Sequence, residues 1–209
     1  KSLYTYDYFH GDEYSNYIAD KPVLQRNFLS RLTVLKKHSS KTQYQSLLEI
    51  GAAYGFFIEK AQLFYKDVMG IDITKSGVDY AANHLKLNVK KIDFLKWNTP
   101  KNKWDIICLW DTIEHLKEPN LFIKKANSLI KKNGLIAITT GDINSIVSKV
   151  RGKNWRLIHP PTHIHYFSKE SLTNLLNKHG FKIIHFSYPG FYRSLDNILY
   201  NIFVLRLKI

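Results

Sequence analysis

Residues 47–55 read Leu-Leu-Glu-Ile-Gly-Ala-Ala-Tyr-Gly, an apolar run that ends in a turn bounded by two glycines. The apolar run predicts a buried strand, and the residues that follow it, 55–66, have a helical pattern. Glycine lets a backbone approach a ligand closely, and a helix N-terminus offers N–H groups that have no partner inside the helix. We therefore expect a ligand to bind at this turn.

The same alternation of short apolar runs and helical patterns continues on both sides of the turn. Strands are predicted at 47–50, 67–72, 89–94, 104–110, 135–140 and 181–188, and helices at 22–37, 55–66, 75–86, 118–132 and 168–179. This alternation is typical of βαβ units. We expect an α/β fold with a Rossmann-like, mostly parallel sheet of about seven strands. Helices should cover both faces, and an antiparallel element should form the C-terminal edge.

Composition limits the class of protein. The chain has 209 residues, 44% of them hydrophobic and 14% aromatic, which excludes a disordered chain. The single cysteine, Cys108, excludes a disulfide framework. No apolar run approaches the roughly 18 residues of a membrane span, and the N-terminus lacks the pattern of a secretory signal. We expect a cytoplasmic, single-domain protein, either a monomer or a homodimer.

The net charge of +14 is unevenly distributed. Residues 1–120 carry 17 basic and 14 acidic side chains, whereas residues 121–209 carry 14 basic and 3 acidic ones. Such asymmetry is found in proteins that bind nucleic acid, anionic lipid or phosphorylated substrates. The simpler alternative is a solvated surface rich in lysine. The apolar segment 195–209 has basic ends, so peripheral membrane contact, burial in the sheet and a dimer contact all stay open.

The glycine turn fits neither of two common nucleotide motifs. A dinucleotide fingerprint counted from Gly51 needs glycines where Ala53 and Phe56 stand, and a phosphate loop needs a Gly-Lys-Ser/Thr ending. Glu49, Gly51 and Gly55 instead resemble the E-x-G-x-G-x-G motif of class I S-adenosylmethionine-dependent methyltransferases, with Ala53 in place of the middle glycine. The segment 104–116, which contains Asp-Thr-Ile-Glu-His, resembles the strand-four motif of that family.

This resemblance covers about residues 45–190 and implies S-adenosylmethionine as the cofactor, with S-adenosylhomocysteine as the product. It implies a cofactor site made of Glu49, Gly51, Ala53, Tyr54, Gly55, Asp72, Ile73, Asp93, Phe94 and Asp111. It divides the single domain 1–209 into a helical cap segment (1–40), a cofactor-binding core (45–141) and acceptor-side elements (142–209). Within the family, Asp72 would bind the ribose hydroxyls and Asp93-Phe94 would contact the adenine.

Each acidic residue of this set also has a structural alternative. A carboxylate at a strand end can accept two hydrogen bonds from a vicinal diol, but Asp72 and Asp93 are also typical N-caps of a following helix. Glu49 inside a parallel strand is costly unless it bonds backbone N–H groups or an amino group of the ligand. Trp104 and Trp110 are expected in the core.

Residues 151–168 carry three histidines within seven positions, at 159, 163 and 165. A hydroxyl acceptor needs a base, and the pKa of histidine lies near neutrality. We therefore expect His163, His165 and His115 as catalytic candidates. Acceptor-binding candidates are Arg151, Trp155, Arg156, His159 and Tyr166. Two alternatives are a rigid, hydrogen-bonded loop and a metal site made of the loop histidines, although the preferred interpretation includes no metal.

The leading hypothesis is a methyltransferase that acts on a hydroxyl of a sugar, a sugar nucleotide or a polysaccharide precursor. The sequence resembles small-molecule methyltransferases found near bacterial surface-polysaccharide genes, and the acceptor is expected to be small, and sugar-like or phosphorylated. Alternatives are an RNA methyltransferase that uses the basic C-terminal half and a non-catalytic binding module. Nucleic acid is the less favoured partner because the basic residues are mostly scattered lysines.

Overall fold

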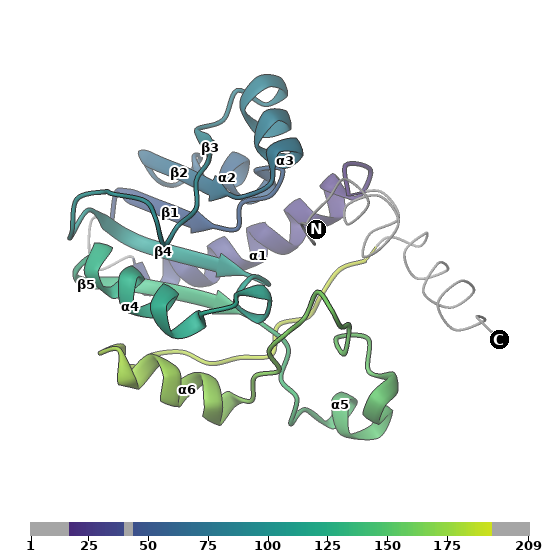
Figure 1. The fold of residues 1–209 in the computed structure, drawn as a ribbon. Coiled ribbons are helices and arrows are strands. Elements are labelled where there is room, and N and C mark those ends of the chain that lie inside the picture. Colours follow the sequence, from purple (N-terminus) through teal and green to yellow (C-terminus); the bar gives the residue numbers. More distant parts are fainter. Residues whose placement is uncertain (1–16, 40–43, 194–209) are drawn as a thin grey trace.

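A five-stranded parallel sheet forms the centre of the computed structural model, which describes residues 17–39 and 44–193 (Figure 1). Its strands are β1 (Ser46–Ile50), β2 (Asp67–Asp72), β3 (Val89–Lys91), β4 (Trp104–Trp110) and β5 (Ile130–Thr139). They lie in the order β3-β2-β1-β4-β5, and all pairs are parallel. The order reverses between β1 and β4, which is where open α/β sheets bind ligands at the carboxyl ends of the strands.

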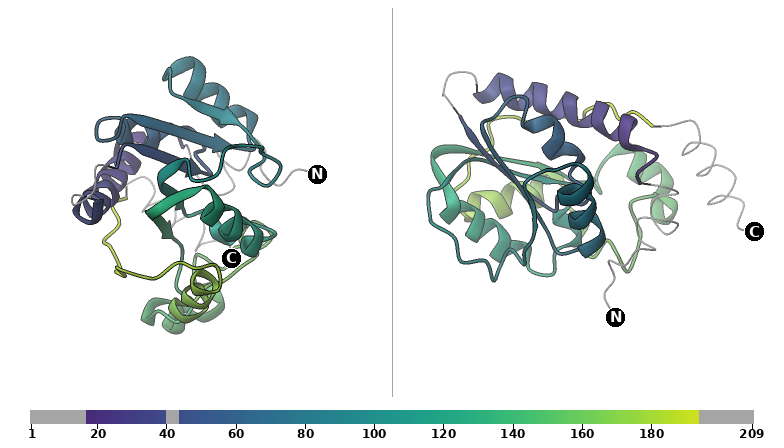
Figure 2. Two further views of the ribbon diagram at one scale, coloured as in Figure 1. Left: turned by 90° about the vertical axis from the view of Figure 1, so that its left-hand side faces the viewer. Right: turned by 90° about the horizontal axis from the view of Figure 1, so that it is seen from above.

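Helices cover both faces of the sheet, as predicted (Figure 2). One face carries α1 (Lys21–Ser39), α2 (Phe56–Ala61) and α3 (Lys75–Asp79), which continues as a π-helical turn over Tyr80–His84. The other carries α4 (Pro119–Leu129) and α6 (Lys169–Lys178). The short α5 (Ile146–Arg151) lies beyond the carboxyl ends of β4 and β5, away from both layers (Figure 1).

Alternate residues of the central strands pack against opposite layers. Leu47 and Ile106 belong to the core beneath α1 and α2, whereas Leu48 and Ile107 belong to the core beneath α4. All four are fully buried, so these strands need apolar residues at successive positions. The two tryptophans of β4, Trp104 and Trp110, are also buried, which confirms that they are core residues.

The predicted boundary between the fourth helix and the last core strand is wrong by a few residues. The helix expected over 118–132 ends at Leu129, and the strand begins at Ile130. The register of β5 against β4 shifts between Ile130 and Leu135, and Asn133 has a φ of 63°. The Asn133-Gly134 pair, which directly follows the predicted helix, therefore lies in a bulge of the strand.

The expectation of seven strands is also corrected. Within the described residues the sheet has five strands, residues 181–188 form none, and no antiparallel element is present there. Phe181 and Ile183 pack against the core of α4 and α6. Residues 135–140 and 180–188 line the same cavity, and their backbones do not pair.

The C-terminal segment 195–209, for which membrane contact, burial and dimerisation were considered, lies outside the described residues. Among the helices of the described ranges, none combines the length and the apolar character that a membrane crossing requires.

Candidate active site

A cavity of about 1820 Å³ begins at the carboxyl ends of the strands and continues along β5 to Asn102 and Lys131 at their amino ends. Its volume therefore includes space on both sides of the sheet edge, and the candidate site is the part at the carboxyl ends. The cavity is lined by seven of the ten predicted cofactor residues: Gly51, Ala53, Asp72, Ile73, Asp93, Phe94 and Asp111. Glu49, Tyr54 and Gly55 are not part of the lining.

The turn after β1 requires glycine at its first position. Gly51 has a φ of 84°, and a Cβ atom placed there would lie 2.5 Å from Oγ1 of Thr112. The N–H groups of Gly51 and Ala52 both donate to the carbonyl of Ile71, at 2.9 and 3.0 Å. Tyr54, in contrast, is buried and stacks in the aromatic core, so its side chain has a packing role and does not face the cavity.

Asp72 connects this turn to the start of α3 through hydrogen bonds. One carboxylate oxygen accepts the N–H of Ala53 at 2.8 Å, and the other accepts the N–H and the hydroxyl of Thr74 at 2.8 and 2.7 Å. Thr74, and not Asp72, is the N-cap of α3, so the helix-cap interpretation of Asp72 is wrong. A carboxylate can accept about four hydrogen bonds, which leaves Asp72 able to bind a ligand hydroxyl.

The end of β3 presents one exposed and one buried residue. Asp93 is exposed and accepts the N–H of Leu95 at 3.1 Å, which closes a turn and not a helix, so its helix-cap alternative is also wrong. Phe94 is buried, whereas Ile73 at the end of β2 is exposed. Both residues line the cavity, and apolar and aromatic side chains are typical of the walls of small-molecule sites.

Glu49 is buried in the middle of the sheet, and its Oε2 atom has no hydrogen-bond partner in the described part of the chain. Burial raises the pKa of Glu49 well above its usual value, the charge of Asp72 raises it further, and Arg31 lowers it. An unpaired carboxyl oxygen in such a place is costly unless a donor binds it. Glu49 is therefore chemically suited to a cationic amino group.

Arg31 of α1 completes the site, although the sequence analysis did not identify it. Its guanidinium lies 2.8 Å from Asp111 Oδ2, and Thr139 donates to Asp111 Oδ1 at 3.0 Å. Desolvation opposes the charged carboxylate, but the charge and hydrogen bond of Arg31 outweigh it and lower the pKa of Asp111. The available signal was a charged residue one position before Leu32, within the apolar stripe of the helix.

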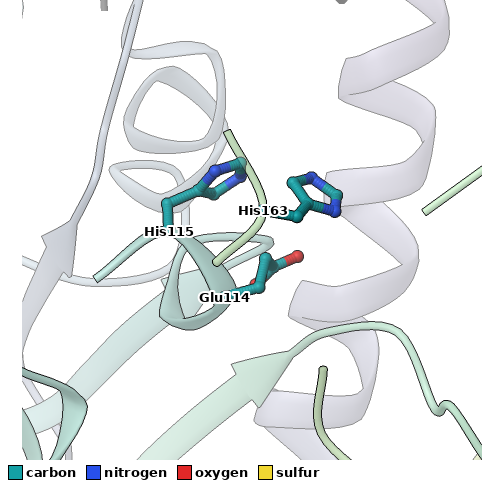
Figure 3. Close-up of side chains that lie close together, drawn as sticks. All are labelled: Glu114, His115 and His163. Atoms are coloured by element: carbon teal, nitrogen blue, oxygen red, sulfur yellow. The ribbon is translucent and has the colours of Figure 1, made fainter. Parts of the chain in front are cut away.

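Glu114, His115 and His163 form a buried cluster between the end of β4 and the histidine loop (Figure 3). The short 3-10 turn Ile113–His115 supplies the first two, and the N–H groups of Ile164 and His165 donate to the carbonyl of Glu114 at 3.0 and 3.1 Å. These two bonds hold the loop against the turn. Glu114 stood in the sequence motif but was not identified as a site residue.

Backbone carbonyls orient both histidines of this cluster. Nδ1 of His115 lies 2.9 Å from the carbonyl of Thr162, and Nδ1 of His163 lies 2.8 Å from the carbonyl of Leu157. A carbonyl only accepts, so Nδ1 carries the proton and Nε2 carries the lone pair. The two rings meet edge to face with centroids 4.6 Å apart.

Burial also controls the ionisation of this cluster. It raises the pKa of Glu114 to about 8, and the nearby charge of Asp111 adds to the increase. Burial lowers the pKa of His115 below its usual value. Both groups therefore favour their neutral forms near pH 7.

The remaining predicted residues are divided between the cavity and the loop. Trp155, Arg156 and His163 line the cavity, whereas Arg151, His159, His165 and Tyr166 do not. Nδ1 of His159 lies 2.8 Å from the hydroxyl of Thr162, and Tyr166 donates to the carbonyl of His163 at 3.1 Å. The hydrogen-bonded loop therefore accounts for His159 and Tyr166. In the described ranges, the residues with converging metal-ligand atoms are Glu114, His115 and His163, not the three loop histidines.

Comparison with known proteins identifies the family. The methyltransferase domain family matches residues 18–186. A ubiquinone biosynthesis O-methyltransferase from Pelagibacter ubique is 33% identical over 130 residues, which cover 59% of this chain and 54% of that protein. The chain thus spans about half the length of the curated relatives it matches.

Solved structures with the same fold include two S-adenosylmethionine-dependent methyltransferases. The protein from Thermotoga maritima has a TM-score of 0.63 and 23% identity, covering 80% of this chain and 77% of its own. The protein from Archaeoglobus fulgidus has a TM-score of 0.65 and 20% identity, covering 79% and 74%. With the cavity, the glycine turn and the family match taken together, the chain belongs to the methyltransferase domain family and has the class I fold that uses S-adenosylmethionine.

Proposed function

We propose that the protein is an S-adenosylmethionine-dependent O-methyltransferase whose acceptor is a small, anionic molecule with a hydroxyl group, such as a phosphorylated sugar or a sugar nucleotide. The observation that carries the proposal is the shared cavity. Asp72 and Gly51 line it beside β1 and β2, and His115 and His163 line it beside β4. One cavity thus joins a cofactor motif to groups that can activate a hydroxyl.

Residues of this chain fit the cofactor. Asp72 lines the cavity and can accept one further hydrogen bond, which suits a ribose hydroxyl, and Gly51 lines it without a side chain. Glu49 is not part of the lining, but its buried Oε2 has no partner among the described residues, which suits the amino group. When bound, S-adenosylmethionine supplies a methyl group on a positively charged sulfur. Asp111 carries a negative charge at the same wall, and it stays ionised because Arg31 pairs with it.

Activation of the acceptor is assigned to the cluster of Glu114, His115 and His163. In the transfer, the acceptor oxygen loses its proton and bonds to the methyl carbon, while the carbon–sulfur bond breaks and its electron pair stays on sulfur. The Nε2 lone pairs of His115 and His163 are positioned to take the proton, because their Nδ1 atoms are held by carbonyls. The enzyme otherwise contributes alignment and proximity.

Three arginines support an anionic acceptor. Arg156 and Arg193 line the cavity. Burial lowers the pKa of Arg193, and the charges of Arg156 and Arg151 lower it further, so the three guanidinium groups lie close enough to repel one another. Arginine binds phosphate through a planar, bidentate fork. The O-methyltransferase name of the Pelagibacter ubique relative supports oxygen as the methylated atom.

Calorimetric titration with S-adenosylmethionine tests the cofactor assignment. We expect micromolar affinity in the wild type and a loss of at least about 10-fold in Asp72→Ala, since charge-assisted hydrogen bonds contribute about 1.5–3 kcal/mol. Asp79→Ala, which removes an exposed aspartate paired with Lys75, should bind like the wild type. A folded wild-type protein that gives no binding heat would contradict the proposal.

Transfer of a radiolabelled methyl group to a panel of hydroxyl compounds tests the acceptor class. We expect phosphorylated sugars and sugar nucleotides to be methylated in preference to neutral glycosides. Arg156→Ala should raise KM for these acceptors about 10-fold and leave the affinity for S-adenosylmethionine within 2-fold. Equal KM values in Arg156→Ala and the wild type would refute the anionic subsite.

A further inference from the structure

We propose that Glu114, His115 and His163 form a binding site for a divalent transition-metal ion. Each residue offers one ligand atom, and these atoms lie within 4.8 Å of one another. Figure 3 shows the three side chains converging from two segments, the turn after β4 and the histidine loop. Ligand atoms lie about 2.0–2.2 Å from a bound Zn²⁺, so small side-chain rotations would close the site around an ion.

An unpartnered atom points to the same conclusion independently. Glu114 is 4% exposed, and its Oε2 atom has no hydrogen-bond partner among the described residues. A buried carboxyl oxygen without a donor costs free energy that the fold must offset. A cation bound at this oxygen would remove that cost, whereas His163, also buried at 6% exposure, would provide a neutral ligand beside it.

The surroundings of the two histidines match those of metal ligands. Protein-bound metals are usually held by imidazoles whose second nitrogen donates to a carbonyl or a carboxylate, which fixes the ring and its tautomer. His115 and His163 each have Nδ1 at 2.8–2.9 Å from a backbone carbonyl. This arrangement presents Nε2 as the ligand atom of both rings.

The ligand set favours a particular class of metal. Two imidazoles and one carboxylate suit Zn²⁺, Fe²⁺, Co²⁺ or Mn²⁺ better than Mg²⁺, which prefers oxygen ligands. The cluster contains no thiolate, because the single cysteine, Cys108, is buried in another part of the core. Three protein ligands leave a coordination position open, and all three residues line the large cavity.

This site would deepen the proposed function, and its catalytic part depends on that function. An acceptor hydroxyl bound at the open position would have a lowered pKa and would release its proton to solvent. With the ion bound, the Nε2 lone pairs would hold the metal, and the metal would take over the activation of the hydroxyl; the histidines would act as the bases proposed above only in the metal-free protein. Metal binding itself depends on neither the acceptor nor the cofactor, and it can be measured alone.

Equilibrium dialysis of the metal-stripped protein against Zn²⁺, followed by metal analysis, provides the first test. We expect one tightly bound ion per chain, and at least about 10-fold weaker binding in His163→Gln and in Glu114→Gln. His159→Gln is the matched control, since this neighbouring histidine lies outside the cluster and should bind like the wild type. Co²⁺ should give the visible absorption of a tetrahedral nitrogen–oxygen site in the wild type and the control alone.

Equal Zn²⁺ binding by the wild type and His163→Gln, with both proteins folded by circular dichroism, would overturn the metal site. Calorimetry with S-adenosylmethionine on the chelated protein separates the two proposals. Binding of the cofactor without any binding of Zn²⁺ would refute the metal site and leave the methyltransferase proposal intact. Binding of Zn²⁺ without any binding of the cofactor would support the metal site and refute the methyltransferase proposal.

Discussion

The cofactor side of the molecule, residues 46–94, is built differently from the acceptor side, residues 140–193. All five residues of β1 are buried, and backbone hydrogen bonds from Gly51 and Ala52 to Ile71 fix the turn that follows. On the acceptor side, Ile146 and Val150 of α5 are each 81% exposed, and residues 181–193 form neither helix nor strand. The cofactor side is therefore fixed by a buried strand and its backbone hydrogen bonds, whereas α5 and residues 181–193 of the acceptor side are exposed or irregular.

This difference matches the tasks that we assign to the two sides. A site for one constant cofactor can be rigid, whereas a surface that selects an acceptor must vary without disturbing the sheet. The two sides meet where Ile164 and His165 donate to the carbonyl of Glu114. We therefore expect substitutions in the cofactor turn to change stability and cofactor affinity together, and substitutions on the acceptor side to leave cofactor affinity unchanged.

Gly51→Ala should have the largest effect. An alanine at this φ lowers the free energy of unfolding by roughly 1–2 kcal/mol. The clash of its Cβ with Oγ1 of Thr112, at 2.5 Å, lowers it by about a further 1–3 kcal/mol. We expect urea denaturation to give a free energy of unfolding about 3 kcal/mol lower, together with at least 10-fold weaker binding of S-adenosylmethionine. Gly190→Ala, whose Cβ meets nothing within 4 Å, is the control. A stable variant with normal affinity would show that the turn is not rigid.

Asp105→Asn should lower stability by about 2 kcal/mol without changing cofactor affinity. Asp105 Oδ2 accepts the N–H groups of Gln45 and Ser46 at 3.0 and 2.9 Å, and Oδ1 lies 3.0 Å from Lys131 Nζ, near the amino end of β4 and away from the candidate cofactor residues. Asp67→Asn, at an exposed position, is the control. A loss of cofactor affinity in Asp105→Asn would mean that the amino ends of the strands are energetically coupled to the cofactor site at their carboxyl ends.

Asp105 should also make the free energy of unfolding depend on pH. Burial opposes the charge of Asp105, but hydrogen bonds from Ser46 and Gln45 outweigh it and lower the pKa in the folded state. The stabilisation is therefore complete above the unfolded pKa of about 3.9 and is lost as the pH falls through the folded pKa. The difference between wild type and Asp105→Asn should shrink below about pH 4, and a constant difference would contradict this assignment.

The cofactor side is also the part that the sequence predicted well. Strand β2 has the predicted bounds, 67–72, and so does the neighbouring central strand β4, 104–110, because each is a short apolar run flanked by polar or turn residues. Asp72 was identified because its position depends on the local spacing from Gly51. Local patterns are enough to predict site residues that lie in the turn between a strand and the helix that follows it.

The acceptor side was predicted less well because its contacts are distant in sequence. His163 follows β5 and a long loop in the sequence, yet it lies beside Glu114 and His115 in the structure. No periodic pattern in the sequence indicates that contact. Arg31 lies 80 positions from Asp111, its partner. The predicted strand at 181–188 was wrong although β5 offers a free edge, because Phe181 and Ile183 pack against the core of α4 and α6, a contact that the local pattern does not indicate.

Glu49→Gln should separate stability from affinity on the cofactor side. The pKa of Glu49 is raised in the folded state by burial first and then by Asp72, so ionisation costs stability as the pH rises above the unfolded value of about 4.3. We expect the cofactor-free variant to be about 1 kcal/mol more stable than wild type at pH 7, with a smaller gain near pH 5. Binding of S-adenosylmethionine should weaken at least 10-fold.

Thermal denaturation at several pH values, with calorimetry on the same samples, measures both effects of Glu49→Gln. The control is Glu170→Gln, which changes an exposed glutamate in the first turn of α6. Weaker binding without any gain in stability would mean that a donor from the protein already satisfies Glu49. A gain in stability with unchanged binding would exclude Glu49 from the cofactor site.

Ser168→Ala should have the smallest effect and should be confined to the acceptor side. Ser168 is the N-cap of α6, and it forms a capping box in which Ser168 and Ser171 bond each other's backbone N–H groups. Loss of an N-cap costs about 1 kcal/mol, or a fall in Tm of roughly 2–4 °C at this chain length. Cofactor affinity should stay within 2-fold. Thr173→Ala, within the same helix, should not lower Tm because alanine has the higher helix propensity. If Ser168→Ala weakened cofactor binding, the two sides would be one cooperative unit, and the contrast between a rigid cofactor side and an adaptable acceptor side would be wrong.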